Sequence, residues 1–190
     1  MALHCIPQAI PDVKLLVPDV FGDARGFFQE TFHAERYRRA GIEAPFVQDN
    51  WSRSVGGTVR GLHYQLNRPQ AKLVWVVKGE IFDVAVDIRR GSPTFGRCVT
   101  ALLSEQNHHQ LFVPAGFAHG FCVVSPEADF FYKCSDVYVP EEERGLLWSD
   151  PELAISWPVR TPLLSKRDLC LKTLADTKPE DLPVFKHAED

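Results

Sequence analysis

The chain has 190 residues, of which 45% are hydrophobic and 24% are charged, and its formal net charge is −4. This composition predicts one globular domain over residues 1–190, with a core at about 10–170 and a C-terminal tail at 176–190. The acidic excess and the lack of any run of lysine and arginine argue against a nucleic-acid-binding or membrane-surface protein, because both partners require concentrated positive charge.

The cysteines and the N-terminal residues indicate the cellular compartment of the protein. The five cysteines have irregular spacing and form no Cys-x-x-Cys pair, which is typical of reduced thiols packed as small apolar side chains. The first eight residues have no basic start or long apolar segment, and no apolar run approaches the roughly 18 residues needed to cross a bilayer. A cytoplasmic location is therefore expected.

In chain order, the first predicted elements are a turn and a short helix. Residues 22–26 form a turn that leads into an aromatic strand, and residues 33–40 form a helix of about two turns that ends at Gly41. The alternation in residues 81–89 predicts a strand with one dry face. The other strand-like segments are 60–65, 73–77, 98–103, 111–113, 120–124 and 130–134.

The C-terminal part is expected to contain a second helix over residues 165–175, with Ser165 as its N-cap, and a loosely held segment from residue 179 onward. Helix is therefore scarce. Many short strands separated by glycine and proline are typical of an all-β sandwich or barrel.

Three side chains suited to proton transfer next to a carbonyl lie on the strand-like segments. His63 is a candidate base, Tyr132 a candidate acid, and Lys72 a cation that would stabilise an enolate. Each also has an ordinary structural explanation: a satisfied histidine, a strand-end lysine with its head in water, and a core tyrosine. The polar residues around His63 favour a pocket, because unsatisfied donors are costly to bury.

A metal site is the alternative use of the histidines. A metal-binding strand of this kind often carries His-x-His, but the tripeptide here is His63-Tyr64-Gln65. His119 could be a second ligand, yet no carboxylate clearly completes the set, so no metal is expected.

Two upstream segments carry groups suited to a nucleotide sugar. The block 21–30 is rich in aromatic residues, and residues 48–50 add amide and carboxylate groups that could contact a base and a sugar. Arg25 and Arg60 have the planar guanidinium that pairs well with phosphate oxygens.

Together, five runs of residues resemble the dTDP-4-dehydrorhamnose 3,5-epimerase family. The match is collinear and covers about residues 10–170. The runs are Phe21-Gly22-Asp23-Ala24-Arg25-Gly26-Phe27-Phe28, Gln48-Asp49-Asn50, Val59-Arg60-Gly61-Leu62-His63-Tyr64-Gln65, the segment 82–89 with 92–96, and Pro114-Ala115-Gly116-Phe117-Ala118-His119-Gly120-Phe121.

The resemblance implies a cupin-type double-stranded β-helix, or jelly roll, with short flanking helices. It also implies a homodimer without metal or cofactor that epimerises C3 and C5 of dTDP-4-dehydro-6-deoxy-D-glucose to dTDP-4-dehydro-L-rhamnose. By the same resemblance, the catalytic residues would be His63, Tyr132, Lys72 and Asp168, with Asp168 pairing with His63 or simply capping a helix. The substrate-binding residues would be Arg25, Glu30, Gln48, Asn50, Arg60, His119, Tyr138, Glu143 and Arg167.

Two departures from the family pattern and three alternative functions stay open. Arg167 stands where the family usually has lysine, and Trp75 occupies a strand position where a smaller or polar residue is expected. An epimerase of one centre would keep the same base, acid and cation. A metal-dependent cupin would require bound metal, and a non-catalytic sugar-nucleotide binding module would not need His63 at all.

Overall fold

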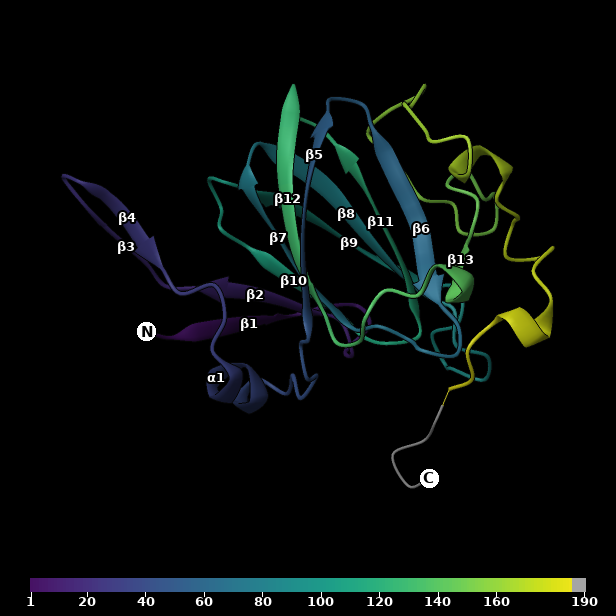
Figure 1. Cartoon of the computed structure of the whole chain (residues 1–190), viewed down its shortest axis with the longest axis horizontal. Helices are drawn as coiled ribbons and strands as arrows, with labels where there is room; N and C mark the ends of the chain where they lie inside the picture. Colours follow the sequence, from purple (N-terminus) through teal and green to yellow (C-terminus); the bar gives the residue numbers. More distant parts are fainter. Residues whose placement is uncertain (186–190) are drawn as a thin grey trace.

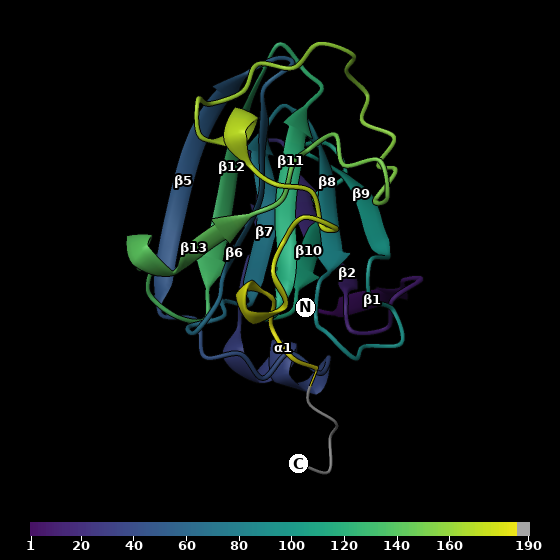
Figure 2. The ribbon, with the colours of Figure 1, turned by 90° about the vertical axis from the view of Figure 1, so that its right-hand side faces the viewer.

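The computed structural model describes residues 1–185 as two antiparallel β-sheets packed face to face, with a hairpin and a short helix at one side (Figures 1 and 2). The six-stranded sheet has the order β1 (Leu3–Pro7), β2 (Lys14–Pro18), β10 (Gln110–Val113), β7 (Lys72–Lys78), β12 (Glu127–Cys134), β5 (Gln48–Val55). The five-stranded sheet has the order β13 (Glu143–Gly145), β6 (Val59–Gln65), β11 (Phe117–Val123), β8 (Glu80–Asp87), β9 (Cys98–Ser104). The predicted jelly-roll architecture is confirmed.

The main core lies between the two sheets. Its buried side chains come from the inward faces of both sheets and include Val74, Ala85, Leu103, Leu111 and Phe130. Alternation along each strand leaves the opposite faces to be covered by other segments. The C-terminal segment covers the five-stranded sheet, and α1 (Ala34–Arg39) with its flanks covers part of the six-stranded sheet.

Strand β8 differs from the prediction of one dry face. Val84 and Val86 pack under the C-terminal segment, but Asp83 and Asp87 on the other face are also fully buried. The expectation was wrong because alternation distinguishes the two faces of a strand but not whether the polar face is covered. The buried carboxylates make hydrogen bonds instead of facing water.

The two predicted helices have different outcomes. Helix α1 ends before Gly41, whose φ of +78° suits glycine, and it confirms the prediction for residues 33–40. The predicted helix at 165–175 was wrong, because only a short 3-10 turn (Asp168–Cys170) forms there. Leu171 is extended, and the chain then turns so that the N–H of Leu174 donates to the buried Asp150 carboxylate.

Residues 179–185 are more ordered than the sequence suggests. A 3-10 turn (Pro179–Asp181) is followed by Val184, which bridges to Arg90, so the prediction of a loose segment was wrong for residues 179–185. The rest of the predicted tail, residues 186–190, lies outside the described residues. Within residues 1–185, no helix is long and apolar enough to cross a membrane.

The predicted turn at 22–26 joins β3 (Val20–Asp23) to β4 (Gly26–Gln29) in a two-stranded hairpin. This hairpin projects away from the two sheets (Figure 1). Its aromatic side chains are exposed, including Phe27 at 65% and Phe28 at 59%. Such an apolar projection suggests a surface that another molecule covers.

Candidate active site

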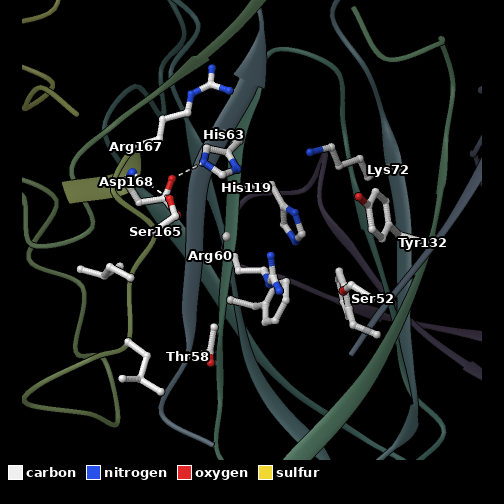
Figure 3. Close-up of a pocket in the computed structure, with 15 residues that line it drawn as sticks. Ser52, Thr58, Arg60, His63, Lys72, His119, Tyr132, Ser165, Arg167 and Asp168 are labelled. Atoms are coloured by element: carbon white, nitrogen blue, oxygen red, sulfur yellow. Dashed lines mark hydrogen bonds and ion pairs between the residues drawn. The ribbon is translucent and has the colours of Figure 1, made fainter. Parts of the chain in front are cut away.

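Two adjoining hollows lie between the sheets, and His63, Lys72 and Tyr132 line both of them. The larger hollow has a volume of about 430 Å³ and the smaller about 260 Å³. Figure 3 shows His63 and His119 on one side of the larger hollow and Lys72 and Tyr132 on the other. The other residues that line the larger hollow are Ser52, Thr58, Arg60, Gly120, Phe121, Phe130, Leu163, Leu164, Ser165, Arg167 and Asp168.

An irregularity in β6 brings both Arg60 and His63 into the larger hollow. These residues are three positions apart, so regular alternation would place their side chains on opposite faces. The pairing of β6 with β11 shifts register between them, since His119 lies opposite His63 and Phe121 lies opposite Arg60. Gly61 permits this close approach, because a Cβ there would lie 2.6 Å from the carbonyl oxygen of His119.

His63 forms a dyad with Asp168, as the family resemblance implied. The distance between His63 Nε2 and Asp168 Oδ1 is 2.7 Å, and the Asp168 N–H donates to Ser165 Oγ at 3.0 Å. Burial tends to raise the pKa of Asp168, but hydrogen bonds from His63, Ser165 and the Gly61 N–H outweigh it and lower the pKa. Asp168 is therefore a charged acceptor that holds the Nε2–H, and His63 Nδ1 is left free to take a proton.

A second histidine-carboxylate pair lies beside the first. His119 Nε2 is 2.9 and 3.0 Å from the two oxygens of Asp83, which is fully buried. This pair fixes the His119 ring at the wall of the larger hollow, next to His63 on the neighbouring strand. Asp83 was missed by the sequence analysis, although its place on the polar face of an apolar strand was the available signal.

Lys72 and Tyr132 come from neighbouring strands of the six-stranded sheet. Burial lowers the pKa of Lys72, although Cys134, Glu143 and Asp83 act in the opposite direction. Burial also raises the pKa of Tyr132, so its hydroxyl keeps its proton at neutral pH. The pair thus offers a cation and a proton donor on the side of the hollow opposite His63.

Arg60 is held in place by strand β5. Its Nε donates to the Oγ of the buried Ser54 at 2.9 Å, and its guanidinium faces the larger hollow. Ser54 and Ser52 were not predicted, but the sequence holds a signal for them. Polar residues at every second position of β5 alternate with exposed residues such as Trp51, and this pattern marks a polar inward face.

The smaller hollow gathers the remaining predicted binding residues. Gln48 Nε2 donates to Asn50 Oδ1 at 3.0 Å, and Tyr138 OH donates to Glu143 Oε2 at 3.0 Å. Arg167 forms an ion pair with Glu143 and thereby joins the walls of the two hollows. The unpredicted residues of this hollow are Tyr64, Gln65, Gln70 and Cys134.

Two predicted binding residues do not line either hollow of the chain. Arg25 lies at the turn of the projecting hairpin, where it pairs with Asp23 and is 90% exposed. Glu30 forms an ion pair with Arg36 of α1. Trp75, the unusual strand residue, also lies outside the hollows, because it packs against Phe131 on the outer face of the six-stranded sheet.

This arrangement can remove a proton next to a carbonyl and return one from the opposite side. In such a reaction His63 Nδ1 would be the base, Tyr132 the acid, and Lys72 the cation for the negative oxygen of an enolate. Within residues 1–185, no three His, Cys, Asp or Glu side chains gather in a way that could hold a metal ion.

Comparisons with known proteins agree with this chemistry. Residues 7–176 match the family model described as dTDP-4-dehydrorhamnose 3,5-epimerase. The enzyme of that name from Neisseria gonorrhoeae is 54% identical over 181 residues, which cover 95% of this chain but only 55% of that protein. The chain therefore spans about half the length of this relative.

A solved structure and a functionally different relative complete the comparison. The crystal structure of dTDP-6-deoxy-D-glucose-3,5-epimerase from Legionella pneumophila, in complex with dTDP-4-keto-L-rhamnose, is 50% identical, with a TM-score of 0.95. The match covers 97% of this chain and 100% of that one. A dTDP-4-dehydrorhamnose 3-epimerase from Streptomyces niveus is 41% identical over 178 residues, covering 93% of this chain and 86% of that protein.

Proposed function

Because the chain belongs to the dTDP-4-dehydrorhamnose 3,5-epimerase family, we propose that it inverts C3 and C5 of dTDP-4-dehydro-6-deoxy-D-glucose to give dTDP-4-dehydro-L-rhamnose. The observation that carries the proposal is the placement of His63 and Tyr132 on facing sheets, with Lys72 between the two hollows that they share. Inversion of a carbon requires a base and an acid on opposite faces of the sugar.

The mechanism follows from the chemistry of the substrate. The hydrogens on C3 and C5 are both next to the C4 ketone, so His63 can remove either one while Lys72 stabilises the enolate oxygen. Tyr132 then protonates the carbon from the other face. A positioned base or acid contributes roughly 10²–10⁴-fold each. The ketone of the substrate itself accepts the electron pair.

The nucleotide would occupy the space around this catalytic group. Gln48, Asn50 and Tyr138 offer amide and aromatic groups to the thymidine from the smaller hollow. Arg60 and Arg167 offer guanidinium groups to the diphosphate, since they line the larger hollow beside the proposed base. Arg167 retains the positive charge that the family usually carries as lysine.

The main alternative is an epimerase that inverts one centre, as the Streptomyces niveus relative does by its name. The test is to incubate the protein with dTDP-4-dehydro-6-deoxy-D-glucose in D₂O and to follow C3 and C5 by NMR. We expect deuterium and inversion at both carbons. Inversion at one carbon would favour the alternative, and exchange at neither would reject both.

We expect the fall in activity at alkaline pH to reflect the loss of the proton from Lys72. Burial moves the loss of the Tyr132 proton to higher pH than in a free tyrosine and the loss of the Lys72 proton to lower pH than in a free lysine. Activity should fall as Lys72 loses its proton because a neutral amine stabilises the enolate less. The measurement is kcat/KM against pH for wild type and Lys72→Arg, whose guanidinium stays charged. An alkaline limb that is the same in both proteins would contradict the assignment.

The same proposal includes a cytoplasmic homodimer. Free cysteines throughout residues 1–185 suit a reducing compartment. The projecting hairpin exposes Phe27 and Phe28, and β5 exposes Trp51. We infer that these residues form the dimer surface, where Arg25 on the hairpin would reach a nucleotide in the second copy. This arrangement would explain why Arg25 does not line the hollows of its own chain.

A dimer through this surface predicts that Trp51→Asp dissociates the protein. Trp51 is 65% exposed, and a buried carboxylate at an apolar interface is unfavourable. Sedimentation equilibrium should give a dimer for wild type and a monomer for Trp51→Asp. The matched control is Leu102→Asp, since Leu102 is a 47% exposed residue on β9 of the other sheet. A dimer for both variants would place the interface elsewhere, and a monomeric wild type would reject the dimer.

A further inference from the structure

His63 must lose the proton that it has taken from the substrate before it can act again, and Glu143 lies close enough to receive that proton. After one inversion, His63 holds the proton from carbon and Tyr132 has become a phenolate. If His63 serves two carbons in turn, as the proposed function requires, the reset happens between the two inversions. In an enzyme of one centre, the same reset happens between turnovers.

The two ring nitrogens of His63 face different carboxylates. Nε2 lies 2.7 Å from Asp168, whereas Nδ1 lies 4.0 Å from Glu143 Oε1. A hydrogen bond needs roughly 2.7–3.2 Å, so a movement of about 1 Å or one bridging water would connect Nδ1 to Glu143. Glu143 is on β13, which pairs with β6 so that Gly145 lies opposite His63.

The side chain of Glu143 is 15% exposed and contacts two residues at the protein surface. Its Oε2 accepts a hydrogen bond from Tyr138, which is 45% exposed, and it is paired with Arg167, whose side chain is 50% exposed. By contrast, the side chain of Asp168 is 4% exposed. Glu143 therefore stands between the catalytic base and groups in contact with water.

Asp168 is poorly suited to carry a proton. Burial favours its neutral form, but hydrogen bonds from His63, Ser165 and the Gly61 N–H lower its pKa and leave it a stable anion. It also faces Nε2, not the nitrogen that receives the proton. Asp168 and Glu143 are the carboxylates that line the two hollows in the described part of the chain, so Glu143 is the candidate carrier.

We propose that Glu143 resets His63 by accepting the Nδ1 proton after each abstraction and passing it to solvent at the mouth of the smaller hollow. Each cycle balances. When the C–H bond breaks, its proton goes to Nδ1 of His63 and its electron pair goes to the enolate. Tyr132 then gives its proton to the carbon. Glu143 delivers the Nδ1 proton to water, and water reprotonates the Tyr132 phenolate. Pairing of Arg167 with the substrate diphosphate would free the Glu143 carboxylate for this transfer.

The test is a rapid-quench time course with Glu143→Gln and dTDP-4-dehydro-6-deoxy-D-glucose. Gln can still accept the Tyr138 hydrogen bond but cannot carry a proton. We expect a burst of one inversion per active site, followed by a phase at least about tenfold slower than wild-type turnover. Added imidazole or formate buffer should accelerate the slow phase, because a small acid or base can replace the missing carrier. Glu143→Asp should restore part of the rate.

The binding control is Arg167→Gln, which removes the ion pair and a proposed diphosphate contact. It should raise KM without producing a burst. The proposal would be overturned if Glu143→Gln showed no burst, or if its slow phase did not respond to buffer, since either result would leave Glu143 a binding residue. These outcomes do not depend on how many centres are inverted, so a wild type that inverts one carbon would reject the proposed function while leaving the test of the carrier intact.

Discussion

His63→Ala should lose turnover by roughly 10²–10⁴-fold while keeping its fold, because the variant lacks the proposed base. The His63 side chain is 26% exposed in an open hollow, so its removal leaves little buried cavity. The measurement is kcat with dTDP-4-dehydro-6-deoxy-D-glucose, together with deuterium exchange at C3 and C5 in D₂O. Both inversion and exchange should be lost, because no C–H bond is broken without the base.

The control for this variant is His4→Ala, since His4 lies on the edge strand β1 and outside the site. It should match wild type in rate. The thermal midpoint of His63→Ala should also stay close to that of wild type. Near-normal turnover of His63→Ala with an intact fold would mean that another group removes the proton, and His119, held by Asp83 on the neighbouring strand, would be the next residue to test.

The fold was largely predictable because most of its strands are short apolar or alternating segments bounded by turn residues. The segments 73–77 and 130–134, for example, are parts of β7 and β12. Strands β1, β2, β3, β5 and β13 were missed. Four of them have only three to five residues, whereas the eight-residue β5 is rich in polar side chains and lacks an apolar face. The helix at 165–175 was predicted from a capping pattern, but Asp168 pairs with His63 instead of serving a longer helix. A tertiary contact therefore overrode the local pattern.

The site was predictable in its residue types but not in how they meet. Arg60 and His63 line the same hollow only because β6 shifts its register against β11. The sequence of one strand does not predict such a bulge. Asp83 looked like part of a solvated face until its strand was covered on both sides. In the smaller hollow, Tyr138 donates its hydroxyl to the nearby Glu143 and its backbone N–H to Gln48, which is 90 residues away in sequence. The sequence motifs therefore predict the chemically active residue types, whereas the packing of the strands determines which of these side chains lie together.

Tyr132→Phe is expected to separate proton removal from inversion. The variant keeps the ring that packs against Phe130 at 5.4 Å, but it lacks the hydroxyl that would protonate carbon from the face opposite His63. Turnover should fall by roughly 10²–10⁴-fold. His63 and Lys72 are intact, so the enolate should still form and then be reprotonated by His63 on the original face. In D₂O, exchange of the His63 proton with solvent would place deuterium in unreacted substrate without inversion.

The measurement compares deuterium in recovered substrate for Tyr132→Phe and His63→Ala under the same conditions. Deuterium should appear with Tyr132→Phe and stay absent with His63→Ala, and this difference assigns base and acid independently of overall rate. If neither variant exchanged deuterium, Tyr132 would be needed to form the enolate and would not be only the final donor. If His63→Ala alone exchanged it, the two roles would be reversed, with the raised pKa of Tyr132 requiring a partner such as Lys72 to make its phenolate a base. The exchange pattern therefore decides which face of the sugar each residue serves.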